Sequence, residues 1–113
     1  MVLFLMMALM ASAQDLVVCS YNIRNSNRGD DKNGNGWKTR YEYLCQQIEF
    51  EDPGLFGCQE VKKEQLDDMI ARMPEYAYVG VGRDDGKEGG EYSPVFYKKD
   101  RYVLLESGTF WLA

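Results

Sequence analysis

The sequence predicts an α/β fold in which parallel strands are joined by helices. Two short apolar segments, residues 16–24 (LVVCSYNIR) and 55–60 (LFGCQE), have the length and composition of buried strands. The segment between them is long enough for the helix that a parallel connection requires. A composition of 45% hydrophobic and 13% aromatic residues is that of a globular protein. Such folds place their chemistry at the carboxyl ends of the strands.

The remaining elements follow in order along the chain. Residues 38–51 predict the crossover helix, because their apolar positions recur at helical spacing and Asp-Pro-Gly ends the run at residues 52–54. A second helix is predicted at residues 62–73, where Pro74 stops it. We then expect a strand at residues 76–81, a polar glycine-rich loop at 83–91, and strands at 95–98 and 102–105 around a turn.

The first 13 residues predict a signal peptide. They carry no charge and end in Ala-Ser-Ala, a pattern that signal peptidase accepts near Ala13. The segment is shorter than the roughly 20 residues of a spanning helix, and Cys19 lacks the context of a lipid anchor. An initial buried strand or helix is the alternative. The interpretation predicts a periplasmic or extracellular protein without a stable membrane anchor.

Three cysteines, Cys19, Cys45 and Cys58, are expected to be free, buried thiols. None lies in a Cys-x-x-Cys arrangement, and all three cannot pair within one chain. The 113 residues include no histidine, so the usual mixed zinc sites are excluded.

Polar residues stand where the two parallel strands end. Asn22 ends the first strand, and Gln59 and Glu60 end the second, so Asn22 and Glu60 should meet at one edge of the sheet. Arg24 and Arg83 follow strand ends and can hold phosphate, because the planar guanidinium binds phosphate oxygens in pairs. The plainer alternatives are a turn-forming Asn, a solvated Glu, and arginines paired with Asp84, Asp85 or another surface acid.

These strand ends, together with residues 36–44, 78–97 and 107–112, resemble the endonuclease/exonuclease/phosphatase superfamily, which has the deoxyribonuclease I-like fold. The resemblance covers nearly everything after residue 15. It implies that residues 14–113 form the N-terminal half of a four-layer α/β/β/α sandwich, truncated before the family's catalytic His, its Asp-x-Asn segment and its closing Asp-His pair.

The same resemblance implies a function. Glu60 would bind a divalent cation, usually Mg²⁺ but also Mn²⁺ or Ca²⁺, and Asn22 would position the metal and the phosphate. The full-length protein would be a metal-dependent phosphoester hydrolase, and this portion would be inactive without the missing C-terminal half of the domain. A net charge of −5 shows no basic groove, so a small phosphorylated substrate is favoured over nucleic acid.

One competing motif supports a different class of function. Residues 31–36 (DKNGNG) followed by Glu42 match the EF-hand calcium-loop pattern. The preceding segment reads as a strand rather than a helix, and Lys38 occupies a position that is normally apolar. The alternative hypothesis is therefore a non-catalytic calcium- or ligand-binding module with a degenerate form of the same fold.

Overall fold

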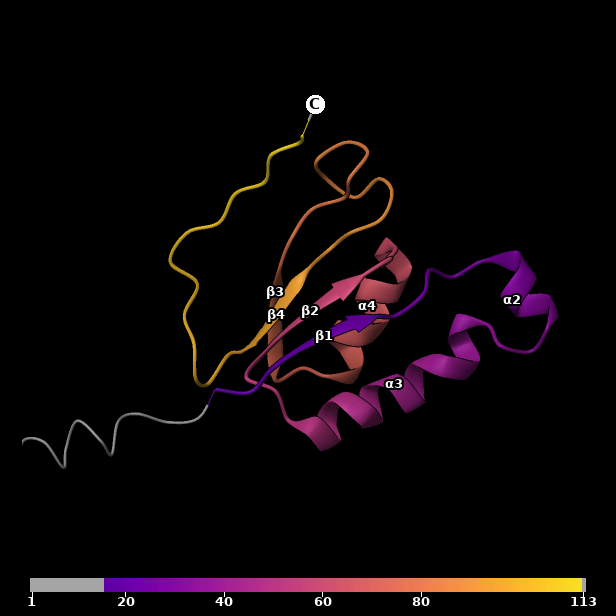
Figure 1. Ribbon diagram of the computed structural model, residues 1–113, viewed down its shortest axis with the longest axis horizontal. Coiled ribbons are helices and arrows are strands. Elements are labelled where there is room, and N and C mark those ends of the chain that lie inside the picture. The colour runs from indigo at the N-terminus through magenta and orange to yellow at the C-terminus, as the bar shows by residue number, and fades with distance from the viewer. Residues whose placement is uncertain (1–15, 113) are drawn as a thin grey trace, which may run out of the picture.

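One mixed four-stranded sheet organises the chain in a computed structural model that describes residues 16–112 (Figure 1). The strand order is β1-β2-β4-β3. β1 and β2 are parallel, while β4 runs antiparallel to both β2 and β3. The elements are β1 (Val18–Asn22), α2 (Arg28–Lys32), α3 (Trp37–Glu51), β2 (Leu55–Gln59), α4 (Lys63–Arg72), β3 (Tyr76–Val79) and β4 (Val95–Lys98).

Helix α3 is the predicted crossover between the two parallel strands. It buries Trp37, Cys45 and Ile48 in the hydrophobic core. It ends at Asp52, which takes the left-handed conformation (φ 48°) and donates its backbone N–H to the Ile48 carbonyl at 2.9 Å. The indole Nε1 of Trp37 donates to the Asp68 carboxylate at 2.8 Å, which ties the start of α3 to α4.

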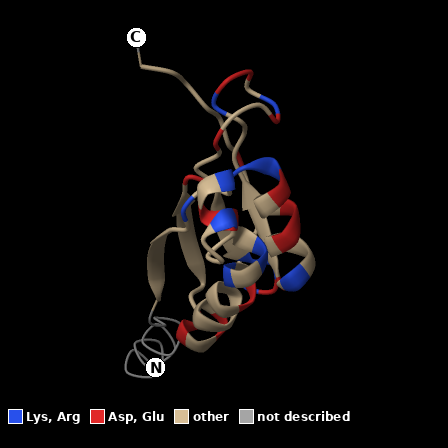
Figure 2. Ribbon diagram, turned by 90° about the vertical axis from the view of Figure 1, so that its right-hand side faces the viewer, with Lys and Arg blue, Asp and Glu red and all other residues tan. Residues whose placement is uncertain are grey.

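The core lies between one face of the sheet and the two long helices. Phe56 of β2 and Phe96 of β4 are stacked with ring centroids 4.6 Å apart, and Tyr76 of β3 meets Phe56 edge-on at 4.9 Å. Leu66 and Met69 of α4 are fully buried against them. In Figure 2 the charged segments gather on the helices and the loop above the sheet, while the strands are largely uncharged.

The other face of the sheet is open. Its side chains alternate with those of the core, and among them Val18 is 61% exposed and Val95 is 44% exposed. Within residues 16–112 no helix or strand covers this face. The described chain is therefore an α layer on a β layer, which is half of the predicted four-layer sandwich.

Two expectations about individual elements are wrong. Residues 102–105 form no strand: Tyr102 closes a turn by donating its N–H to the Lys98 carbonyl, and Val103 and Leu105 are exposed. The short helix α2 was not expected. Asn27 caps it by accepting the Asp30 N–H at 2.8 Å.

The calcium-loop pattern does not form an EF-hand. Asp31 lies in α2, and the Glu42 carboxylate accepts two hydrogen bonds from Arg72 Nε at 2.9 and 3.0 Å. Glu42 thus serves helix packing.

The cysteine expectation is confirmed for Cys45 and Cys58, which are free and buried, while Cys19 is free and half-buried. Burial raises the pKa of Cys45 to about 11 and that of Cys58 to about 12, so both thiols stay protonated at neutral pH. No helix within residues 16–112 is long and apolar enough to cross a membrane. The predicted signal peptide, residues 1–13, lies outside the described residues.

Candidate active site

The carboxyl ends of β1 and β2 lie side by side. Asn22 is the register partner of Gln59, and the Ile23 N–H donates to the Gln59 carbonyl at 3.2 Å. Glu60 follows Gln59 directly, so Asn22 and Glu60 leave the sheet at the same edge, where the sequence predicted them.

Glu60 sits in a β-bulge. Between the Gly57–Val95 pair and the Val61–Tyr92 bridge, one strand has residues 58–60 and the opposite strand only residues 93–94. Glu60 has a φ of 62°, a left-handed conformation that is unfavourable for a residue with a side chain. Bulges of this kind re-aim a side chain and occur next to active sites. Nothing in the dipeptide Gln-Glu predicted this geometry.

Arg24 has the second strained backbone at this edge, with a φ of 59°. Its N–H donates to Asn22 Oδ1 at 3.0 Å, so Asn22 also forms the turn that was the plainer expectation for it. The Arg24 carbonyl accepts from Arg40 Nη2 at 3.2 Å and from Gln65 Nε2 at 3.0 Å. Arg40 Nη1 reaches the Ile23 carbonyl as well, at 2.8 Å.

Gln65 is the buried anchor of this segment. Its side chain is fully buried, and its Oε1 accepts the backbone N–H groups of Ser26 at 3.1 Å and Lys62 at 3.0 Å. Lys62 Nζ in turn donates to the Ser26 carbonyl at 2.7 Å. Helix α4 therefore fixes the chain that leaves β1. Sequence reasoning missed Gln65 and Arg40 as supports, because no local pattern shows that their partners are backbone groups far along the chain.

The Arg24 side chain is paired with Asp30. Its Nε lies 2.5 Å and its Nη2 2.8 Å from the two carboxylate oxygens. The hydrogen bond from Arg24 is the main reason that the pKa of Asp30 falls to about 2. The pKa of Arg24 is raised, chiefly by Asp30 and to a smaller degree by the charge of Glu60. Arg24 thus has an acidic partner, as the alternative expected, but that partner is the buried Asp30 rather than Asp84, Asp85 or another surface acid.

Arg83 is more loosely held. Its side chain is 66% exposed, and its Nε lies 3.8 Å from Asp84 Oδ1. Its backbone N–H donates to the Glu91 carbonyl at 3.0 Å within a compact loop, in which the Asp85 carboxylate accepts the N–H groups of Lys87 and Gly89. Glu91 Oε1 accepts from Asn25 Nδ2 at 3.0 Å, which joins this loop to the segment after β1.

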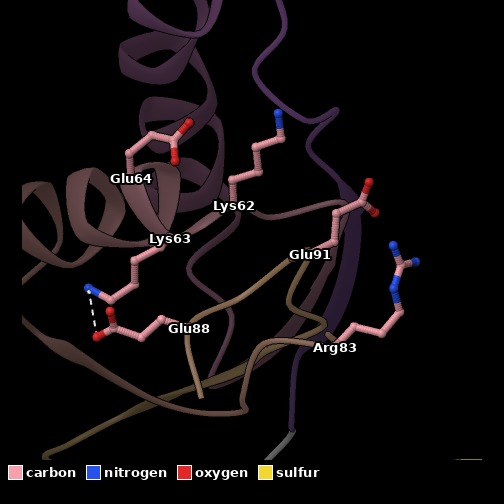
Figure 3. Close-up of a pocket in the computed structure, with 7 residues that line it drawn as sticks. Lys62, Lys63, Glu64, Arg83, Glu88 and Glu91 are labelled. Atoms are coloured by element: carbon pink, nitrogen blue, oxygen red, sulfur yellow. Dashed lines mark ion pairs between the residues drawn. The ribbon is translucent and has the colours of Figure 1, made fainter. Parts of the chain in front are cut away.

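A cavity of about 340 Å³ opens between this loop and the start of α4 (Figure 3). Lys62, Lys63 and Arg83 supply positive charge to its walls, and Glu64, Glu88 and Glu91 supply negative charge. Asn22 and Glu60 do not line it, although Lys62 follows Glu60 by two residues. The cavity is therefore beside the strand-end site rather than within it.

The donors at the strand ends suit a hard cation. Asn22 and Glu60 offer an amide and a carboxylate oxygen, which Mg²⁺ prefers, and Mg²⁺ keeps several waters in place of further protein ligands. Within residues 16–112 no group of three or more His, Cys, Asp or Glu side chains is placed to hold a metal ion. The described residues can thus supply a partial ligand set.

Comparison with solved structures shows the family to which this fold and edge belong. An endonuclease/exonuclease/phosphatase family protein from Bacteroides thetaiotaomicron superposes on this chain with a TM-score of 0.81 and 46% sequence identity. The match covers 82% of this chain and 34% of that protein. A mannosyl-6-phosphatase from the same organism superposes with a TM-score of 0.82 and 46% sequence identity, and the match covers 83% of this chain and 35% of that protein. An endonuclease/exonuclease/phosphatase from Bacteroides vulgatus superposes with a TM-score of 0.78 and 47% sequence identity, and the match again covers 83% of this chain and 35% of that protein. No family model and no curated protein matched the chain.

The chain belongs to the endonuclease/exonuclease/phosphatase family, of which it has the sequence and fold of an N-terminal portion. The first and third of these structures are described as members of that family, and one of the three is a phosphatase. The chain spans about a third of the length of these structures. The predicted fold class is confirmed.

Proposed function

We propose that this chain is the N-terminal part of a metal-dependent phosphoesterase that acts on a small phosphorylated compound. The observation that carries the proposal is the strained bulge that sets Glu60 beside Asn22 at the carboxyl edge, in a chain whose 46%-identical neighbour is a mannosyl-6-phosphatase. Strain of about 1–3 kcal/mol per left-handed residue persists where surrounding structure enforces it, which is typical of functional sites.

In this proposal Glu60 and Asn22 hold Mg²⁺, which Mn²⁺ or Ca²⁺ can replace. A bound Mg²⁺ would neutralise the negative charge that builds on the phosphoryl oxygens. Arg83 has unengaged guanidinium donors beside the site and would bind a phosphate oxygen. Arg24 would contribute positive charge while Asp30 holds its side chain in place.

The open face of the sheet suggests where the rest of the domain would pack. A second sheet contributed by the missing C-terminal half would cover Val18 and Val95 and complete the four-layer sandwich. This half would also supply the water-activating histidine, since the chain itself has none. We therefore expect residues 1–113 alone to be inactive.

Export is a further part of the proposal, and it rests on residues 1–13. Fusion of residues 1–20 to a reporter enzyme that is active only after export tests it. Activity that requires the apolar segment supports export, whereas an inactive, uncleaved fusion contradicts it.

A chimaera tests the catalytic proposal. Residues 16–112 would replace the matching portion of the Bacteroides thetaiotaomicron mannosyl-6-phosphatase. We expect the chimaera to release phosphate from mannose 6-phosphate only when Mg²⁺ is present. Glu60→Gln should lower kcat roughly 100-fold or more, because charge stabilisation at a reacting group contributes on that scale.

Glu88→Gln is the matched control, because Glu88 is an exposed carboxylate on the nearby loop. It should leave kcat unchanged. A folded chimaera that releases no phosphate, or one whose activity is indifferent to Glu60→Gln, would contradict the proposal.

A further inference from the structure

A second cavity, of about 390 Å³, adjoins the first on the other side of Arg83 and Glu91. Both residues line both cavities, so they form the shared wall. The second cavity differs in character, because the aromatic residues Phe110 and Trp111 form part of its lining in place of the lysines. Its lining joins Gly80 and Val81, which follow β3, to residues 109–112 of the C-terminal segment; Figure 1 shows that this segment ends near the loop after β3.

This aromatic cavity reaches the strand next to Glu60. Ser93 lines it, and residues 93–94 are the pair that faces residues 58–60 across the bulge. A ligand in this cavity would thus lie one strand away from the proposed metal ligand. Neither Asn22 nor Glu60 lines the cavity, so it can take a part of the substrate other than the reacting phosphate.

Trp111 is held in place at this cavity. Its indole Nε1 donates to the Arg83 carbonyl at 2.9 Å. Its ring lies against Gly86, where an added Cβ would be 3.2 Å from the ring and where φ is 69°. A side chain at position 86 would therefore push the ring away. Trp111 is 55% exposed as a residue and lines the cavity together with Arg83 and Glu91, so it offers an apolar surface there.

Building on the proposed function, we propose that this aromatic cavity binds the sugar ring of a sugar phosphate. Sugar hydroxyl groups both donate and accept, which suits a cavity lined by both the Glu91 carboxylate and the Arg83 guanidinium. The C–H face of the ring suits the indole of Trp111. Ligand cavities combine apolar walls with a few placed polar groups in this way.

A nucleotide base could also stack on Trp111, but charge favours the sugar. The Glu91 carboxylate repels the successive phosphates of a nucleic acid, and the net charge of −5 gives no basic track for them.

The test follows the indole N–H resonances of the 15N-labelled 113-residue chain in MgCl₂. Mannose 6-phosphate, mannose, inorganic phosphate and adenosine 5′-phosphate are the probes. Mannose 6-phosphate and, more weakly, mannose should shift the Trp111 indole, while inorganic phosphate leaves it in place. Trp37 is only 2% exposed and serves as the internal reference.

Trp111→Ala should weaken mannose 6-phosphate binding at least tenfold and leave inorganic phosphate binding unchanged. Trp111→Phe, which keeps an aromatic ring and so disturbs the loop less, should weaken it less. Phe50→Ala removes an aromatic ring that is 83% exposed on α3 and should change neither affinity.

The outcomes separate this inference from the proposed function. Inorganic phosphate binding that depends on Mg²⁺ and Glu60, with no added affinity from the sugar, overturns the sugar site alone. Tighter binding of adenosine 5′-phosphate than of mannose 6-phosphate assigns the cavity to a base and also overturns it. Absence of any Glu60-dependent binding of Mg²⁺ or phosphate contradicts both.

Discussion

At the scale of single residues, the edge of the sheet combines backbone strain with a dense set of backbone hydrogen bonds. Glu60 and Arg24 are both left-handed, and Arg40 and Gln65 hold the Arg24 segment from two helices. Glycine adopts a left-handed backbone without the clash of a Cβ atom. A glutamate in this conformation at position 60 supports the proposal that its side chain binds the metal.

Glu60→Gly should uncouple stability from metal binding. Relief of a left-handed strain of about 1–2 kcal/mol is partly offset by the roughly 0.5–1 kcal/mol entropic cost of glycine. We expect a free energy of unfolding equal to the wild type or up to about 1 kcal/mol higher by urea denaturation. Mg²⁺ binding, measured by calorimetry, should be lost.

Glu60→Ala is the control, since it removes the carboxylate but keeps the Cβ. It should lose Mg²⁺ binding without any gain in stability. If Glu60→Gly instead destabilises the fold as much as a core truncation would, the glutamate side chain holds the loop and the strain argument is wrong.

Gln65 should be a large contributor to stability for a polar residue. Gln65→Met keeps much of the buried volume but leaves the N–H groups of Ser26 and Lys62 and the Arg24 carbonyl without this partner. A buried unpaired group costs roughly 1–3 kcal/mol, so we expect a loss of about 3 kcal/mol or more in the free energy of unfolding.

Gln47→Met, on the exposed face of α3, removes one side-chain hydrogen bond to Glu51 and should change stability by less than about 0.5 kcal/mol. Equal urea midpoints for the two variants would show that the loop does not depend on Gln65.

The Arg24–Asp30 ion pair should make the free energy of unfolding depend on pH in the acid range. The folded-state pKa of Asp30 is lowered from 3.8 to about 2, so the stabilisation is present above the unfolded pKa and is lost as the pH falls through this interval. Asp30→Asn should lower the unfolding free energy at pH 6, and its deficit relative to wild type should shrink between pH 4 and pH 2.

Arg24→Met should give the same pH dependence, because it removes the other partner of the pair. A deficit for Asp30→Asn that stays constant from pH 6 to pH 2 would mean that the lost hydrogen bonds, rather than the charge, stabilise the α2 segment.

At the scale of elements, hydrophobic periodicity and helix stop signals were enough to predict the two long helices. The two long helices were predicted to within one residue at each end, because their apolar spacing and their Asp-Pro-Gly or Pro74 stops are local features. The strand at residues 102–105 failed because a strand needs a partner, which apolar composition cannot supply. Helix α2 was missed, although Asn27 followed by Asp30 and Asp31 is a local capping signal.

One arginine of α4 pairs with two carboxylates of α3. The guanidinium of Arg72 reaches Glu42 at 2.9 Å and Glu49 at 2.8 Å, and the hydrogen bond from Arg72 lowers the pKa of Glu42. Arg72→Met should lower the free energy of unfolding at low salt, since it leaves two carboxylates close together. The loss should shrink in 1 M NaCl, where screening is strong.

Lys63→Met removes an i,i+4 pair with Asp67 within one helix and a longer contact with Glu88 at 4.0 Å, and it should cost less than Arg72→Met. A salt-independent loss for Arg72→Met would instead assign its contribution to the packing of its alkyl chain.

At the scale of the whole molecule, the sheet has one covered and one open face. The candidate site lies at the carboxyl ends of β1 and β2, on the edge that the two faces share. That Asn22 and Glu60 leave the sheet at the same edge could be predicted, because parallel strands fix which ends are neighbours. The bulge, the Asp30 partner of Arg24 and the aromatic cavity could not, because each depends on contacts between segments far apart in the chain or on local backbone geometry.

The open face of the sheet should cause the 113-residue chain to self-associate. Leu55, Val79, Val95 and Tyr97 line an apolar cavity of about 240 Å³ between this face and residues 102–104, and exposed apolar surface of this kind drives association. We expect concentration-dependent self-association by analytical ultracentrifugation and binding of the dye ANS. Val95→Lys places a charge on the open face of β4 and should reduce both, while circular dichroism stays unchanged.

Tyr43→Lys, on the exposed side of α3, should reduce neither, because that side of the helix faces solvent already. A monomeric chain that does not bind ANS would mean that the face is covered, and it would then leave no room for the second sheet that the proposed enzyme requires.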